Sequence, residues 1–250
     1  MGGLLFLAAV ILLLFSANSA AAQGISIDLG PDGSLAGRSV QLLVLVTVLS
    51  LVPGLAIMIT CFPFIVTVLS ILRQAIGLQQ APPNMMIITL ALFLTYFIME
   101  PVFLEAWAVG IEPFIAGTTE VGEAFTQTIE PFRGFMSNRI NPETFEALAS
   151  LRPDLPTDVP LRDGPLSVLI PSFLLSEIAR AFQVGFLIFL PFLIIDLVVA
   201  AVLMSMGMMM VPPAIVSLPF KLAFFVVANG WTLISESLVR SIQGRRRQPE

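Results

Sequence analysis

An apolar stretch from residue 166 to residue 210 constrains the fold of this chain more than any other feature. As one helix this stretch would be about 67 Å long at 1.5 Å per residue, whereas the hydrocarbon core of a bilayer is about 30 Å thick. A single membrane crossing cannot accommodate that length. We therefore expect the stretch either to turn back inside the membrane or to rise beyond it as part of a protein assembly.

Further apolar stretches cover residues 40–72 and 85–111. The stretch that begins at residue 166 continues to residue 239, with a break near 211–213. The composition is 57% hydrophobic and 12% charged, and such values are typical of membrane proteins. Backbone groups at membrane depth must bond within the segment, and the alternation expected of barrel strands is absent. The sequence therefore predicts an all-α, membrane-associated protein with four helical segments.

Prolines interrupt these segments, and each removes a backbone donor and bends a helix axis. We expect long, kinked helices. The prolines concerned are Pro53, Pro63, Pro101, Pro171, Pro191 and Pro219.

The amino-terminal end has the form of a secretory signal peptide. Residues 4–15 are apolar but too short to span a bilayer, and small residues follow up to Ala22. The predicted signal is residues 1–22, and a polar segment, 23–39, comes next. Because the segment before the apolar run carries no basic side chain, an uncleaved anchor is the alternative.

Residues 112–163 form the one extended polar region and carry more acidic than basic residues. This excess fits an extracytoplasmic face, where basic residues need not be retained, and gives no indication of nucleic-acid binding. Within the region we expect a short helix at 141–148, capped by Asn141 with Pro142 at its first position. The simpler alternative is a solvated connection without a further role.

The predicted topology contains a conflict. With a cleaved signal and four crossings, the polar region 112–163 and the carboxyl-terminal tail both lie outside the cytoplasm. The tail, however, carries Arg245, Arg246 and Arg247, which the positive-inside rule places in the cytoplasm. Either the signal stays attached, or one segment does not cross, or the final position is not that of an ordinary membrane protein.

Five of the eleven methionines fall within residues 204–210, just before Pro212 and Pro213. A methionine side chain is unbranched and deformable, so a loop built from it can seal an irregular opening and still repack. The alternatives are ordinary lipid-facing or core packing, and Cu(I) binding by thioethers, which usually needs help from Cys or His. The predicted gasket residues are Met204, Met206, Gly207, Met208, Met209 and Met210.

Five charged residues lie in apolar surroundings, where each costs about 2.5–3.5 kcal/mol at a helix centre: Glu177, Arg180, Asp196, Lys221 and Glu236. Glu177 and Arg180 are three residues apart and can pair on one helix face. Asp196 and Lys221 would lie about 24 Å and 12 Å from a hairpin turn at the two prolines, and so would miss each other within one chain. We expect these two, and with less reason Glu177 and Arg180, to make contacts between subunits.

No residue pattern indicates catalysis or a cofactor. The chain has no histidine, and its one cysteine, Cys61, lies in an apolar stretch where a small buried side chain is expected. No nucleophile with a base, no phosphate-binding glycine loop and no metal motif is present in the sequence. We therefore expect a protein that is not an enzyme and that holds no metal or cofactor.

Two long strings, residues 60–84 and 188–213, resemble signature stretches of the FliP family of flagellar export-gate proteins. The resemblance continues through Leu218–Lys221 and covers about residues 42–240. It implies a subunit of the type III protein export gate in the bacterial inner membrane, at the flagellar basal body and partly exposed to the periplasm. Residues 23–39 and much of 112–160 carry no family string, and neither does the basic tail.

The resemblance also implies partners and a mechanism. Family members form a closed ring of several copies, by resemblance a pentamer, with FliQ and FliR, and the FlhA and FlhB subunits work beside it. Unfolded proteins pass through this channel, and its methionine-rich loop closes it, which fits the gasket interpretation. An assembly that sits largely above the bilayer would explain the overlong helix and the topology conflict.

Other interpretations remain open from the sequence. They are a homologue from a virulence injectisome, a structural scaffold whose methionines only pack, and a solute transporter, although the broken-helix repeats of transporters are not seen. The chain accordingly divides into a signal peptide (1–22), a polar segment (23–39), a first helical hairpin (40–111), an extracytoplasmic region (112–163), a second hairpin with the methionine loop (164–240) and a basic tail (241–250).

Overall fold

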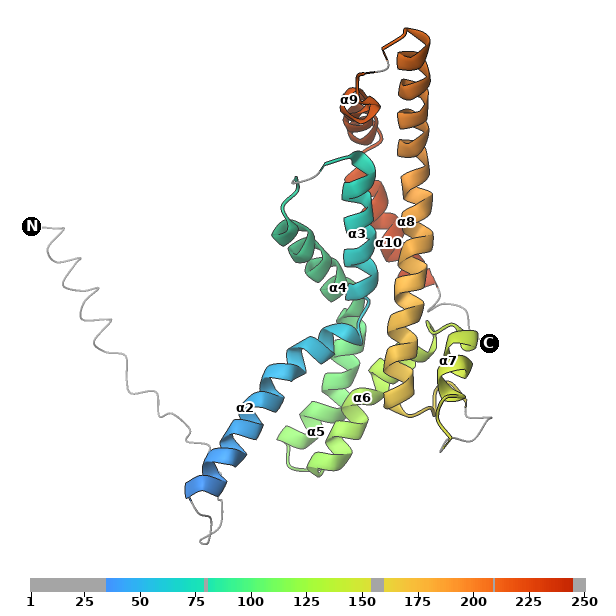
Figure 1. Ribbon diagram of the computed structural model, residues 1–250. Coiled ribbons are helices and arrows are strands. Elements are labelled where there is room, and N and C mark those ends of the chain that lie inside the picture. The colour runs from blue at the N-terminus through green and yellow to red at the C-terminus, as the bar shows by residue number, and fades with distance from the viewer. Residues whose placement is uncertain (1–34, 79–80, 154–159, 209, 245–250) are drawn as a thin grey trace, which may run out of the picture. The chain divides into compact units, whose positions relative to one another are not determined.

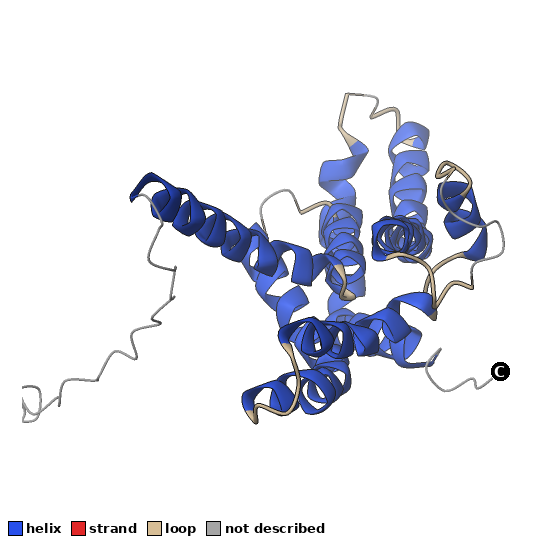
Figure 2. Ribbon diagram, turned by 90° about the horizontal axis from the view of Figure 1, so that it is seen from below, coloured by secondary structure: helices blue, strands red, loops and turns tan. Residues whose placement is uncertain are grey.

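The computed structural model describes residues 35–78, 81–153, 160–208 and 210–244. Throughout these residues the regular structure is helical, as the sequence predicts (Figures 1 and 2). The chain divides into two compact units, residues 1–50 and 51–250, and the predicted site residues lie in the second. The predicted signal peptide, most of the polar segment and the last six residues fall outside the described part.

The described helices follow one another with short connections. In chain order they are α2 (Leu35–Met58), α3 (Phe62–Ile76), α4 (Asn84–Ala106), the π-helix η1 (Trp107–Ile111), α5 (Glu112–Ile115), α6 (Val121–Ser137), α7 (Pro142–Ala149), α8 (Leu166–Ser205), α9 (Pro213–Val227) and α10 (Gly230–Gln243).

The sequence predicts one helical segment over the stretch 40–72, but the stretch is divided between two helices. Helix α2 ends at Met58 and α3 begins at Phe62. Pro63 stands in the first turn of α3, where its missing N–H is tolerated, and it could not continue the ladder of α2. Thr60 supports the break, since its hydroxyl donates to the Ile57 carbonyl and accepts from the Phe62 N–H. Cys61 at this turn is fully buried, as expected.

Helix α8 runs without interruption for 40 residues, about 60 Å. It stays helical through Pro171 and Pro191, so the stretch does not turn back inside a membrane. Two described helices are long and apolar enough to cross a bilayer, Asn84–Ile115 and Leu166–Ser205. These helices give the chain a membrane location.

The sharp bend of the carboxyl-terminal stretch comes after α9 and not at a proline. Helices α9 and α10 meet at 63°, although α9 itself continues through Pro219. Asn229 adopts a left-handed conformation between them, with φ of 49°, which an asparagine tolerates better than most residues. Whether the prolines inside the helices also kink them stays a prediction.

The polar region 112–163 is largely folded. The predicted short helix is confirmed as α7, and the Asn141 side chain accepts from the Glu143 N–H at 3.0 Å. Helix α6 was not foreseen, because Pro131 and two glycines hide its helical pattern. It packs against η1 and α4 and buries Phe135 and Met136.

The core of the second unit forms where α3 lies against α8, with α4 on the other side of α3. Phe64, Leu69 and Leu72 of α3 and Phe173 of α8 are fully buried there. The last turns of α8 extend past the end of α3, and α9 lies beside them (Figure 1). This arrangement places the methionine loop at the end of the α8–α9 hairpin, away from the core.

Candidate functional site

The methionine loop joins α8 to α9 at the far end of the hairpin (Figure 1). Its side chains are exposed, with 62% for Met204, 67% for Met206, 42% for Met208 and 97% for Met210. Met209 lies outside the described residues. The loop therefore presents a cluster of deformable apolar side chains that nothing in the described part of the chain covers.

The loop is anchored at its first turn by a specific end to α8. The Met208 N–H donates to the Leu203 carbonyl and the Gly207 N–H to the Met204 carbonyl, which is the Schellman pattern of helix termination. Gly207 has a φ of 74°, a region that favours glycine, so this residue lets the chain turn tightly at the end of α8. The loop thus leaves α8 from a fixed point, at which Leu203 is buried.

No charged residue occurs between Asp196 and Lys221, a stretch that covers the end of α8, the whole loop and the start of α9. Large apolar side chains flank the loop on both helices, since Leu197 is 69% exposed and Ile215 is 70% exposed. An ion that reaches this end of the hairpin would find no charged partner. The arrangement suits a barrier to hydrated ions.

Asp196 and Lys221 are paired within the chain, which corrects the expectation that they would miss each other. Lys221 Nζ lies 2.5 Å from Asp196 Oδ2. The estimate from sequence treated every residue up to Pro212 as helical. In the structure α8 ends at Ser205, and a loop connects it to α9, which begins at Pro213. Asp196 is then nine residues from the helix end and Lys221 eight residues into α9, so the two are nearly level, about 12–14 Å from the ends of their helices.

This pair also connects the hairpin to α3. Ser217 donates to Asp196 Oδ1 at 2.5 Å, and Lys221 Nζ donates to the Ala75 carbonyl at 3.2 Å. Ala75 lies in the last turn of α3, where a cation is favoured by the helix dipole. The network therefore fixes α8, α9 and α3 relative to one another just inside the apolar end that carries the methionine loop.

Glu177 pairs with Arg180, as the three-residue spacing predicts, at 2.9 Å. A second partner of Glu177, Arg139 from the segment after α6, makes two hydrogen bonds to the same carboxylate at 3.0 and 2.8 Å. The Glu177 side chain is fully buried, so the expectation of a subunit contact there is wrong. Arg180 also donates to the Arg139 carbonyl, which closes the network within the chain.

Arg139 was missed because it belongs to the polar region, 38 residues before its partner. Its guanidinium lies over the rings of Phe64 and Phe135 at 5.8 and 5.6 Å, and only 2% of the residue is exposed. A lone arginine between a polar helix and an asparagine cap gives no local signal of burial. Contacts of this kind depend on tertiary structure alone.

The described residues contain no cluster of three or more His, Cys, Asp or Glu side chains that could hold a metal ion. The two charge networks above consist of ion pairs and hydrogen bonds, and neither places a nucleophile beside a base. What the described residues do provide is an exposed apolar loop and two fixed charge networks.

The sequence matches the FliP family over residues 45–238. It is 47% identical to the flagellar biosynthetic protein FliP of Caulobacter vibrioides, over 95% of this chain and 89% of that protein. The flagellar biosynthetic protein FliP of Bacillus subtilis is 45% identical over 87% of this chain and 98% of its own length. That of Aquifex aeolicus is 45% identical over 94% and 99%. The family match at residues 45–238 spans the positions of both charge networks and the methionine loop.

Proposed function

The chain belongs to the FliP family, and from this membership we propose that it is a core subunit of the type III export gate through which flagellar proteins leave the cell. The relatives reported above all carry a flagellar name, which favours the flagellum over a virulence injectisome. Membership makes the chain a component of the flagellar export apparatus. We assign it a structural role without catalysis.

The methionine loop acts as the seal of this gate. The observation that carries this role is the exposed, charge-free end of the α8–α9 hairpin, on which Met204, Met206 and Met210 project. Thioether side chains can part around an unfolded polypeptide of any sequence and close again behind it. With no charge between Asp196 and Lys221, the closed loop denies ions a partner.

Several copies form the gate, by family resemblance as a ring of five with FliQ and FliR type subunits and with FlhA and FlhB type subunits beside it. The exposed apolar surface of α8 supports such an assembly, since Phe186, Ile194 and Val202 are each more than half exposed. The complex sits in the inner membrane at the flagellar basal body, and the folded region 112–163 faces the periplasm. Unfolded flagellar proteins are the substrates.

The test compares ion leak and assembly for two matched variants. In the first, Met206→Ser and Met208→Ser make the loop polar. In the second, Met85→Ser and Met86→Ser change two methionines at the start of α4 that are somewhat more exposed, at 72% and 62%. Ion conductance across the inner membrane and the mass of the purified complex are measured for both.

We expect the loop variant to leak ions through an intact complex and the α4 variant to remain tight. A scaffold without a gate would give a different result, because its loop variant would lose assembly without any leak. A tight, fully assembled loop variant would contradict a seal at this position.

A further inference from the structure

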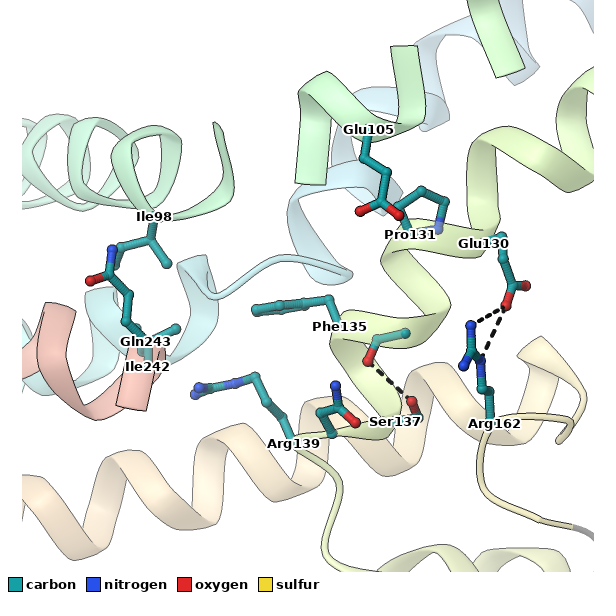
Figure 3. A pocket seen from close by; sticks show the side chains of 12 residues that line it. Ile98, Glu105, Glu130, Pro131, Phe135, Ser137, Arg139, Arg162, Ile242 and Gln243 are labelled. Carbon is teal, nitrogen blue, oxygen red and sulfur yellow. Dashed lines mark hydrogen bonds and ion pairs between the residues drawn. The ribbon is translucent and has the colours of Figure 1, made fainter. Parts of the chain in front are cut away.

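A cavity of about 270 Å³, lined by polar and apolar residues alike, lies between α4, α6 and the end of α10, apart from the methionine loop (Figure 3). Its lining includes Glu105 of α4, Glu130 and Phe135 of α6, and Gln243, the last residue of α10. Six residues follow Gly244 in the sequence, and three of them are arginines. The basic tail therefore leaves its helix at the wall of this cavity.

One carboxylate of the cavity is open to a cation. Glu105 has no ion-pair partner among the described residues, and its side chain is directed toward Pro131 across the cavity (Figure 3). Glu130 already contacts Arg162 at 3.3 Å and Arg133 at 3.5 Å. These contacts are long and solvent-exposed, so a better placed arginine can replace them at little cost.

One buried donor at the wall of the cavity lacks an acceptor within the residues that the structure describes. Arg139 uses its Nε and Nη2 for Glu177, but its buried Nη1 has no hydrogen-bond partner in the described part of the chain. A buried donor without an acceptor is unfavourable, and a backbone carbonyl is the commonest group that satisfies one. The cavity thus presents an acceptor for a guanidinium and a donor for a carbonyl, which together match an arginine-containing peptide.

We propose that the carboxyl-terminal tail, residues 244–250, folds back into this cavity. One of Arg245–Arg247 pairs with Glu105, and a tail carbonyl accepts from Arg139 Nη1. Each extended residue adds about 3.3–3.6 Å of reach, and tethering at Gln243 gives the tail a high effective concentration at the cavity.

Docking of the tail also resolves the conflict over topology. The end of α10 lies beside α4 and α6, so α10 ends next to the acidic region. Pairing with Glu105 lowers the cost of keeping arginines on an extracytoplasmic face. The basic tail and the acidic region then form one packed surface of the subunit.

Crosslinking in the full-length chain within its membrane complex tests this docking. Ser137→Cys lines the cavity without joining the proposed contacts, and Gln248→Cys follows the arginines. The matched control is Ser150→Cys, an exposed serine after α7, with the same Gln248→Cys. Native Cys61 is fully buried and serves as an unreactive background thiol.

We expect the Ser137 pair to crosslink at least about fivefold faster than the Ser150 pair, as a docked tether would. Adding Glu105→Gln lowers the rate about two- to fivefold, the range of an exposed ion pair. Glu105→Arg combined with Arg245→Glu, Arg246→Glu and Arg247→Glu restores the crosslinking rate. Equal rates for both pairs, or no effect of Glu105→Gln, would overturn the proposal.

Two further outcomes identify a different occupant, and each overturns intrachain docking. A crosslinked dimer would mean that the tail binds a neighbouring copy. Loss of the crosslink in vesicles that contain phosphatidylglycerol, with retention in phosphatidylcholine alone, would mean that the tail prefers anionic lipid.

Discussion

The two halves of α8 belong to one continuous helix but differ in how much of their surface the rest of the chain buries. Most of the buried positions of the helix fall in its first half, Leu166–Gly185, and in the second half, Phe186–Ser205, only Phe192 and Leu203 are buried. The buried positions of the first half are Val168, Leu169, Ser172, Phe173, Ser176, Glu177, Ala181 and Gly185.

The charges follow the same division. Glu177 in the first half is fully enclosed by two arginines of its own chain, whereas the Asp196 side chain in the second half remains 32% exposed beside Lys221. The first half is therefore a folding core that one chain completes by itself. The second half leaves apolar surface for lipid or other subunits, and this is the half that leads to the methionine loop.

The largest effect on stability is expected from Arg139→Ala, which leaves Glu177 buried with one arginine. Removing one partner of a buried pair costs about 3–5 kcal/mol, so the free energy of unfolding in detergent should fall by that amount. Arg152→Ala, at an exposed position, is the control and should change little. If both variants unfolded alike, the first half of α8 would not depend on its charge network.

Lys221→Met should have an intermediate effect. It leaves Asp196 with Ser217 alone, and the partial exposure of Asp196 to solvent limits the loss to about 1–3 kcal/mol in the free energy of unfolding. Charge exchange locates the pairing: Asp196→Lys with Lys221→Asp should restore export when both changes are on one chain. Restoration by two co-expressed single variants would instead place the pair between subunits.

Gly185→Ala should act through the contact between α3 and α8. A Cβ at this position would lie 2.4 Å from Ile71 Cδ1, so the two helices must shift or Ile71 must repack. Overpacking of this kind costs about 1–3 kcal/mol, measured by thermal unfolding. Ile71→Val removes the colliding atom and should recover part of the loss, whereas absence of any recovery would point to another cause.

Gly207→Ala tests the second half by a different mechanism. The added Cβ meets no atom within 4 Å, but the φ of 74° makes alanine unfavourable by about 1–2 kcal/mol. The free energy of unfolding should therefore fall by no more than about 1–2 kcal/mol, and we expect a measurable ion leak from a loop that no longer closes. A membrane that stays tight would contradict this assignment.

The smallest effect on the chain itself is expected from Leu197→Ala. Leu197 is 69% exposed, so its truncation should change the free energy of unfolding by no more than about 0.5 kcal/mol while weakening assembly of the complex. Leu169→Ala, at a fully buried position of the first half, should cost about 2–5 kcal/mol. Equal losses at the two positions would remove the distinction between the halves.

Local signals in the sequence predicted the features that depend on neighbouring residues. The Asn141 cap and the Glu177–Arg180 pair follow from spacings of one to three residues, and the length of the apolar stretch anticipates α8. Helix α6 was missed because Pro131 weakens its pattern. The bend at Asn229 was missed because a left-handed asparagine leaves no mark in hydropathy.

Contacts between residues far apart in the sequence were not predictable in the same way. Arg139 reaches Glu177 across 38 residues, and Lys221 reaches both Asp196 and the last turn of α3, 146 residues earlier. The position of Lys221 depended on where α8 ends and how the loop crosses, neither of which periodicity determines. An estimate that continued the helix to Pro212 therefore misplaced the two residues by about two helical turns relative to each other.

Photocrosslinking of a stalled export substrate tests the central claim, that the methionine loop lines the passage for unfolded protein. A photoreactive residue is placed at Met206 in the loop and, as the control, at Ser150 on the folded region after α7. The account predicts substrate adducts from position 206 and none above background from position 150. Continued export without any substrate adduct at position 206 would contradict a seal formed by this loop.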